Sequence, residues 1–281
     1  MAWFSGGTKV PQLHILENEI KVSPLNFSRE LKDKLQQLNF EERWGLTKRL
    51  LPVLEKTKTR NLVRLFFSEE TAGIMDLLER KEETNMAVEC LGYFPSRETV
   101  EVLVQFLNHK NEETQLIAAG ALTNHTPRLV VPCVMEKFLE GEIPVSRAGD
   151  VLLGMDYLAQ EALLEAYEQA TAEVKGQILE LLTASRNPKC KQFLAPALLS
   201  EEIVLKKAAL QAVAAFKPRD LWLEVAMCLA EPAWQIRTKA MEVLSELKVK
   251  EALEMVTPFL EDEDPWVRKA AETCIEKLEK E

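Results

Sequence analysis

The feature that most constrains this chain is a pattern of apolar residues that recurs about every 31 positions. Its last copy has the spacing i, i+4, i+8, i+11, occupied by Val267, Ala271, Ile275 and Leu278. That spacing predicts one face of an amphipathic helix. A second apolar-periodic segment, 252–260, lies just upstream, and the acidic link between the two is long enough only for a tight connection. Each copy therefore predicts a helical hairpin.

The pattern continues upstream through most of the chain. The position that Val267 occupies in the second helix recurs in steps of 31 residues, with one step of 29, at Val267, Ile236, Leu205, Val174, Val145, Thr114 and Glu83, and it is apolar in the last five copies. Seven copies can be aligned, and the first three are the weaker ones. A fixed period with two helices per unit is typical of a stacked solenoid.

These copies predict an all-α fold, an α-solenoid or superhelix of about seven αα-hairpins. Only ten glycines and three tyrosines occur, and 28% of the residues are charged, which argues against a sheet. We expect a poorly readable N-terminal tail over 1–26, a divergent helical cap over 27–67 and a single elongated repeat array over 68–281. In the cap, an apolar period from Phe27 with Ser28 beside it predicts the start of a helix.

The second-helix segments resemble those of HEAT repeats. The segments concerned read DEDPWVRKAAETCIEKL, AWQIRTKAMEVLSEL and VLKKAALQAVAAF. They are similar in particular to the short bacterial repeats also found in bilin-lyase subunits, and Pro196 and Pro258 resemble the kink of a HEAT first helix. The resemblance spans about Thr71 to Leu278, with a period below the roughly 40 to 47 residues of the longer units. It implies that the second helices line a concave face.

The charge of the chain is unevenly distributed. The net charge is −10, and residues 141–281 hold 17 Lys and Arg against 25 Asp and Glu. Phosphate binding depends on clustered lysines and arginines, so we expect nucleic acid to be a disfavoured partner.

One segment, Arg43 to Arg64, is strongly basic, with seven cations against the single acid Glu55. Pro52 and the polar run 56–59 predict a division into two helices. On the second helix, the spacing of Lys56, Arg60 and Arg64 places three cations on one face. They are candidates for binding an acidic partner or, with weak support, an anionic membrane surface, and the alternative is a solvated helix face. For an electrostatic partner, this segment is favoured over the acidic C-terminal repeats.

A basic column runs through the last four repeats: Lys175, Lys206, Arg237 and Arg268. Acids accompany each member near the start of the second helix. We expect these residues to form a structural ladder that joins neighbouring repeats, and the alternative is a cationic stripe for an anionic ligand.

Two tryptophans, Trp234 and Trp266, stand at the starts of neighbouring second helices. Tryptophan is favoured as an interface anchor, so both are candidate partner-binding residues, with simple packing as the alternative. The outward-facing columns of the second helices are expected at Asn85, Leu116, Arg147, Gly176, Lys207, Thr238 and Lys269 and, one turn on, at Glu89, Gly120, Val151, Glu180, Gln211, Glu242 and Thr273.

The sequence predicts no catalytic, cofactor-binding or metal site, and no cofactor. His109 and His125 are isolated, and the five cysteines form no CxxC pair and fall in helical patterns. The N-terminus lacks the apolar core of a signal peptide, so we expect a cytoplasmic protein.

The function we expect is that of a non-catalytic protein-binding scaffold or adaptor, which presents its concave surface to a protein partner whose identity the sequence does not reveal. The alternative is an enzyme or enzyme subunit on a HEAT-like fold, either a bilin-lyase-like factor or, less favoured, a DNA glycosylase. The sequence leaves the question of an enzyme open and leans against it.

Overall fold

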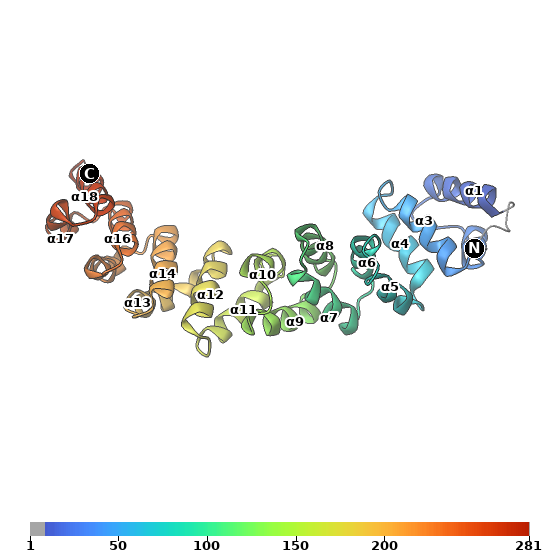
Figure 1. Ribbon diagram of the computed structural model, residues 1–281, viewed down its shortest axis with the longest axis horizontal. Helices are drawn as coiled ribbons and strands as arrows, with labels where there is room; N and C mark the ends of the chain where they lie inside the picture. Colours follow the sequence, from blue (N-terminus) through green and yellow to red (C-terminus); the bar gives the residue numbers. More distant parts are fainter. Residues whose placement is uncertain (1–8, 281) are drawn as a thin grey trace. The chain divides into compact units, whose positions relative to one another are not determined.

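The computed structural model describes residues 9–280, and Figure 1 shows the helices in chain order. Every element of regular structure in this range is an α-helix or a 3-10 helix, which confirms the all-α prediction. The chain divides into two compact units, Met1–Val151 and Leu152–Glu281. The predicted division at residues 26 and 67 rests on repeat character and stays a prediction.

The first unit begins with four helices: α1 (Lys9–Val22), α2 (Arg29–Gln36), α3 (Phe40–Leu50) and α4 (Lys56–Phe67). The start of α2 agrees with its prediction from the sequence. Ser28 caps this helix, and its hydroxyl accepts a hydrogen bond of 3.2 Å from the Leu31 amide. Helix α1 was not predicted, since residues 1–26 were interpreted as a tail. It is a helix whose Ile20 side chain is fully buried. The expectation for residues 1–8 lies outside the described residues.

Three helical hairpins follow: α5 (Thr71–Leu77) with α6 (Thr84–Leu91), α7 (Arg97–Gln105) and η1 (Phe106–Asn108) with α8 (Glu112–Leu122), and α9 (Pro127–Leu139) with α10 (Val145–Leu152). Successive second helices pack closely here. A Cβ atom on Gly92 would lie 2.8 Å from the Ala121 Cα atom, so only glycine fits.

The second unit contains four hairpins. The first pairs α11 (Asp156–Tyr167) with α12 (Ala172–Ala184), and the next pairs η2 (Pro188–Phe193) and α13 (Leu194–Leu198) with α14 (Ile203–Phe216). Then η3 (Arg219–Leu221), α15 (Trp222–Met227) and η4 (Cys228–Ala230) pair with α16 (Trp234–Leu247). Last, η5 (Lys250–Ala252), α17 (Leu253–Val256) and η6 (Thr257–Glu261) pair with α18 (Pro265–Glu279). The seven hairpins within residues 71–279 confirm the predicted repeat.

The first helix of the last hairpin differs from its prediction. The apolar period predicted one amphipathic helix over 252–260, but α17 is only four residues long between two 3-10 segments. Ala252 and Val256 are buried as expected, whereas Met255 and Leu260 are each 40% exposed. Pro258 has no amide hydrogen to donate and its ring crowds the preceding turn, so the α-helix ends there.

The backbone marks the repeat independently of the side chains. In the second unit four non-glycine residues have positive φ: Asp156, Arg186, Lys217 and Lys248. Their spacing is 30, 31 and 31 residues. The last three directly follow or lie near the C-terminal end of a second helix, where a left-handed residue ends the helix and lets the chain turn.

Within each unit, small residues lie between neighbouring second helices. Ala87, Ala118, Ala209, Ala240 and Ala271 are all fully buried. Side chains of this size allow neighbouring second helices to approach closely, which keeps their outward faces side by side. The candidate site depends on this arrangement in α14, α16 and α18.

Candidate functional site

Helices α14, α16 and α18 of the second unit together form an open groove of about 560 Å³. Six residues of the expected outward columns line it: Lys207, Thr238, Lys269, Gln211, Glu242 and Thr273. Gly176 and Val151, which were also expected to face outward, are buried instead. Trp234 and Trp266, the two candidate partner-binding tryptophans, also line the groove. The groove therefore contains both these tryptophans and residues of the outward columns, which the sequence had suggested separately.

Trp234 and Trp266 are exposed at the entrance of this groove. Trp234 is the first residue of α16 and is 38% exposed, and Trp266 is the second residue of α18 and is 67% exposed. The equivalent first positions of α14 carry Ile203 and Val204, which are 51% and 56% exposed. Apolar side chains thus follow the starts of three successive second helices and form an apolar edge, defined here as these four residues.

Four lysines line the groove: Lys207, Lys239, Lys269 and Lys277. The Lys239 ammonium lies 2.9 Å from the Glu242 carboxylate, and the Lys269 ammonium lies 3.0 Å from the Glu272 carboxylate. The hydrogen bond to Glu272 and its charge raise the pKa of Lys269. Lys207 and Lys277 make no side-chain ion pair or hydrogen bond with any described residue. The sequence analysis missed Lys239 and Lys277 as groove residues.

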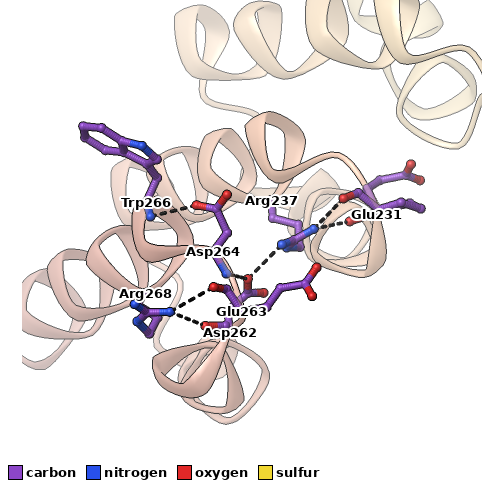
Figure 2. Close-up of polar contacts among 8 residues, drawn as sticks. Glu231, Arg237, Asp262, Glu263, Asp264, Trp266 and Arg268 are labelled. Atoms are coloured by element: carbon purple, nitrogen blue, oxygen red, sulfur yellow. Dashed lines mark hydrogen bonds and ion pairs between the residues drawn. The ribbon is translucent and has the colours of Figure 1, made fainter.

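A buried ion pair lies behind the apolar edge. Arg237 Nη2 donates a hydrogen bond of 2.8 Å to Asp262 Oδ1, and less than a tenth of either side chain is exposed. Arg237 Nη1 also donates to the backbone carbonyls of Glu231 and Pro232, at 2.9 and 2.7 Å. Figure 2 shows the guanidinium between these carbonyls and the Asp262 carboxylate. Arg237 therefore joins the turn before its own helix to the turn of the next hairpin.

The turn at residues 262–264 positions Trp266 at the start of α18. The Asp264 amide donates to Asp262 Oδ1 at 2.9 Å, and the Trp266 amide donates to Asp264 Oδ1 at 2.8 Å, which caps the start of α18. Arg268 donates to the backbone carbonyls of Asp262 and Glu263 from the same helix. Figure 2 shows the Trp266 ring pointing away from this network, so the network fixes the backbone and leaves the indole free.

The carboxyl of Asp262 is held in its charged form. Burial alone would raise its pKa, but the hydrogen bond from Arg237, the amide of Asp264 and the charges of Arg237 and Arg268 lower the pKa overall. The sequence alone could not predict this lowered pKa, because it depends on which carboxylate is buried beside Arg237.

The other members of the basic column differ from one another. Lys206 pairs with Glu231, 25 residues later, as Arg237 pairs with Asp262. Lys175 instead lies 5.4 Å from the centre of the Tyr167 ring, because the residue 25 positions later is Ser200 and has no charge. Arg268 donates to the backbone carbonyls of Asp262 and Glu263. The structure thus provides two bridges between hairpins, and the role of the whole column as a ladder stays a prediction.

The basic segment Arg43 to Arg64 is largely engaged within its own unit. Arg43 pairs with Glu70 at 2.7 Å, Lys48 with Glu83 at 2.7 Å and Arg49 with Glu17 at 2.9 Å. Lys58 donates to the carbonyls of Lys21 and Ser23. The predicted division into two helices is present, and Pro52 lies between α3 and α4 as expected. The polar run 56–59 does not divide them, because it forms the first turn of α4.

The three candidate cations of α4 are in unequal positions. Arg64 Nε donates to the Tyr93 carbonyl at 2.7 Å. Lys56 and Arg60 make no ion pair or hydrogen bond with a described residue, although Lys56 lies close enough to Glu89 to oppose the rise that burial causes in the pKa of that carboxyl. A joint docking role for Lys56, Arg60 and Arg64 stays a prediction.

The remaining reactive side chains are buried. All five cysteines are buried and free, and burial raises the pKa of the Cys228 and Cys274 thiols to about 11, which leaves little thiolate at neutral pH. Within residues 9–280 no three His, Cys, Asp or Glu side chains are grouped so as to hold a metal ion.

None of the described helices combines the length and apolar character needed to cross a membrane.

Comparison with known proteins gives one family match. The family model described as Armadillo/beta-catenin-like repeat matches residues 98–124, which include most of α7 and all of α8. No curated protein sequence matches the chain significantly.

The chain is also similar to several solved helical proteins. The complex of CpcE and CpcF of phycocyanin lyase from Nostoc sp. PCC7120 is 15% identical, with a TM-score of 0.33, over 92% of this chain and 96% of that chain. Kap121p is 13% identical, with a TM-score of 0.47, over 97% of this chain and 38% of that chain. An engineered protein is 15% identical, with a TM-score of 0.44, over 96% of this chain and 89% of that chain.

The repeated hairpins make the described part of this chain an α-solenoid, and residues 98–124 match an armadillo-like repeat. Its units are short helical hairpins that recur about every 31 residues and resemble those of HEAT repeats. Folds of this kind are typical of binding scaffolds, because stacked units present extended surfaces.

Proposed function

We propose that this chain is a non-catalytic protein-binding scaffold or adaptor whose partner binds in the groove of α14, α16 and α18. The observation that supports this most directly is the pair of exposed indoles at the groove entrance, Trp234 and Trp266. Covering an indole removes a large apolar area from water, on the order of 150–250 Å² for a whole side chain. Because Trp234 is 38% and Trp266 67% exposed, covering both removes roughly one whole indole side chain from water, on the order of 5 kcal/mol at about 25 cal/mol per Å² before the entropic cost of association is subtracted.

The residues beneath the groove are buried, and polar contacts hold the start of α18 in place. The floor of the groove is formed by buried residues such as Ile236 and Met241, and the helix that carries Trp266 is fixed by the Arg237–Asp262 pair. A surface that is already ordered loses less conformational entropy on binding. This favours a binding role for Trp234 and Trp266 over the alternative that they only pack at the edge of the core.

The groove is wide enough for a short extended segment. Packed helices lie 8–10 Å apart, so three of them span about 20 Å, which an extended chain covers in roughly six residues. We therefore propose a peptide segment of a partner protein as the bound element. A random peptide library of about ten residues displayed on phage, selected against the full-length chain, tests this proposal.

The selected peptides should bind the parent chain and lose at least tenfold in affinity for the variant Trp234→Ala/Trp266→Ala. Leu223→Ala is the matched control, because Leu223 is 53% exposed on α15 and lies outside the groove. Selected peptides that bind the double variant as tightly as the parent would contradict the proposal.

The bilin-lyase-like alternative has a separate test, which is the absorbance of the purified chain after incubation with a bilin. Pigment that stays bound through gel filtration would support that alternative. The alternative of a DNA glycosylase requires a basic groove that follows a duplex. The second unit opposes this, since residues 152–281 contain 16 Lys and Arg against 23 Asp and Glu.

A further inference from the structure

We infer that the segment bound in the groove is acidic, with carboxylates on either side of an apolar or aromatic side chain. This inference rests on the proposed function and adds the chemistry of the partner. It differs from the expectation drawn from charge counts along the sequence, which favoured the N-terminal basic helices for an electrostatic partner.

The charge of the groove is opposite to that of its surroundings. Four lysines and one glutamate line the groove, whereas the unit that contains it has seven more acids than bases. Positive side chains gathered in an acidic unit give the groove a local field that attracts an anion. Charge complementarity therefore favours an acidic occupant over a basic one.

Two of the four lysines are available to a partner. Lys239 and Lys269 already have carboxylates at 2.9 and 3.0 Å. Lys207 on α14 and Lys277 on α18 have no such contact with a described residue. Lys207 lies near the start of α14 and Lys277 near the end of α18, on the two outer helices of the groove. A segment that runs obliquely from the start of α14 to the end of α18 therefore meets a free ammonium group near each end.

The apolar edge supplies the other half of the recognition. Trp234 and Trp266 lie at the starts of α16 and α18, at the same end of the groove as Lys207, and Lys277 lies about 16 Å further along α18. An aliphatic or aromatic side chain of the partner can pack on these indoles while a carboxylate near it reaches Lys207 and a second carboxylate, several residues further along the segment, reaches Lys277. This arrangement specifies alternating chemistry along the segment.

The same residue types can bind single-stranded nucleic acid, since bases stack on aromatic rings and lysines bind phosphates. The groove fits this occupant less well. No arginine lines it, and two of its lysines are paired with carboxylates. A nucleic acid carries a phosphate charge at every nucleotide, so the acidic residues around the groove would repel it along its whole length. We therefore favour the acidic peptide, and an oligonucleotide becomes an arm of the test.

The test uses peptides selected on the full-length chain and measures their affinity by fluorescence anisotropy. Each peptide is also made with Asn and Gln in place of every Asp and Glu. The charge-reversal variant is Lys207→Glu/Lys277→Glu. The matched control is Lys189→Glu/Lys250→Glu, which changes the net charge equally at two exposed lysines outside the groove.

We expect the selected peptides to be rich in Asp and Glu, to lose at least tenfold in affinity on amide replacement, and to lose as much for Lys207→Glu/Lys277→Glu. The control variant should bind within about twofold of the parent, and Lys207→Arg/Lys277→Arg should retain binding. Affinity should fall as salt rises from about 0.05 to about 0.2 M, because exposed charges are then screened more strongly.

The other outcomes overturn the inference in distinct ways. Peptides that need Trp234 and Trp266 but bind equally well without their carboxylates would contradict the acidic partner and leave the proposed function intact. Peptides that need neither tryptophan, or the absence of any enriched peptide, would contradict the proposed function itself. Competition by an oligothymidylate at equal or lower concentration would assign the groove to nucleic acid. Helical circular dichroism of every variant shows that it has folded.

Discussion

Arg237 and Asp262 form a buried ion pair at 2.8 Å between two successive hairpins, and the residues are 25 positions apart. Lys206 and Glu231 form the same contact with the same separation one repeat earlier. The shared spacing means that the repeat itself places a cation of one second helix against the turn before the next. In both cases that turn leads into a helix that begins with an exposed tryptophan.

The first prediction concerns the buried pair. Arg237→Ala should lower the free energy of unfolding by roughly 3 kcal/mol, because it leaves the Asp262 carboxylate buried without its partner. Lys239→Ala is the control, since it removes an exposed pair with Glu242 and should change stability by no more than about 0.5 kcal/mol. Urea denaturation measures both. Equal losses for the two variants would contradict a bridge between hairpins.

The same pair predicts a dependence on pH. The pKa of Asp262 is lowered in the folded chain, so in acid the unfolded chain takes up the proton first. The stabilisation is present above about pH 4 and is lost as the pH falls through the folded pKa. Asp262→Asn should therefore flatten this acidic part of the stability curve.

A second pH effect should come from His125. This side chain is 6% exposed, and both of its ring nitrogens lack a hydrogen-bond partner. Burial, with a smaller effect from the charge of Arg64, lowers its pKa. The unfolded chain then binds the proton more readily, so stability should fall as the pH drops below about 6.5.

The size of this loss is bounded by linkage. If His125 stayed neutral in the folded chain, the loss between pH 7 and pH 5 would be at most roughly 2 kcal/mol. His125→Leu should remove it, because leucine occupies the equivalent positions Leu247 and Leu278. Thermal unfolding at both pH values tests this, and an unchanged difference between them in the variant would show that another group is responsible.

Two glycines of the first unit should respond oppositely to alanine. Gly92→Ala places a Cβ atom 2.7–2.8 Å from Ala121, including its backbone, and should cost roughly 1–3 kcal/mol. Gly120 lies within α8 with no atom within 4 Å of an added Cβ, so Gly120→Ala should stabilise by about 0.5–1 kcal/mol. Denaturant midpoints for the two variants should move in opposite directions, and a shift in the same direction would contradict the close packing at Gly92.

The left-handed residues give a prediction about the backbone. Lys217 has a φ of 52° at the end of α14, where glycine is favoured, so Lys217→Gly should be neutral or stabilise by up to about 1 kcal/mol. Gln211→Gly, in the middle of the same helix, should destabilise by about 1 kcal/mol. Equal destabilisation by both variants would contradict a left-handed conformation at Lys217.

The repeat and its outward columns were predictable because they follow from spacing alone. The columns that contain Lys207 and Gln211 line the groove as expected, since a fixed period brings equivalent positions of successive helices together. The capping role of Ser28 was equally local. Helix α1 was missed, because its apolar period is weak and its stability depends on packing by residues such as Ile20.

The candidate site was only partly predictable because charges pair across repeats. Seven cations between Arg43 and Arg64 suggested a free basic surface, but partners such as Glu17, Glu70 and Glu83 lie outside that segment. The gathering of Lys239 and Lys277 in one groove was likewise invisible in a count over 141–281. A net charge along the sequence does not say which side chains share a face.

The measurement that tests the central claim most directly is photo-crosslinking of a selected peptide that carries a diazirine, followed by mass spectrometry of the full-length chain. If the groove is the binding surface, the crosslinks should map to α14, α16 and α18 at residues such as Lys207, Glu242 and Lys277, and excess unlabelled peptide should abolish them. Crosslinks that map instead to α4 around Lys56 and Arg60 would contradict the account and assign binding to the basic helices of the first unit.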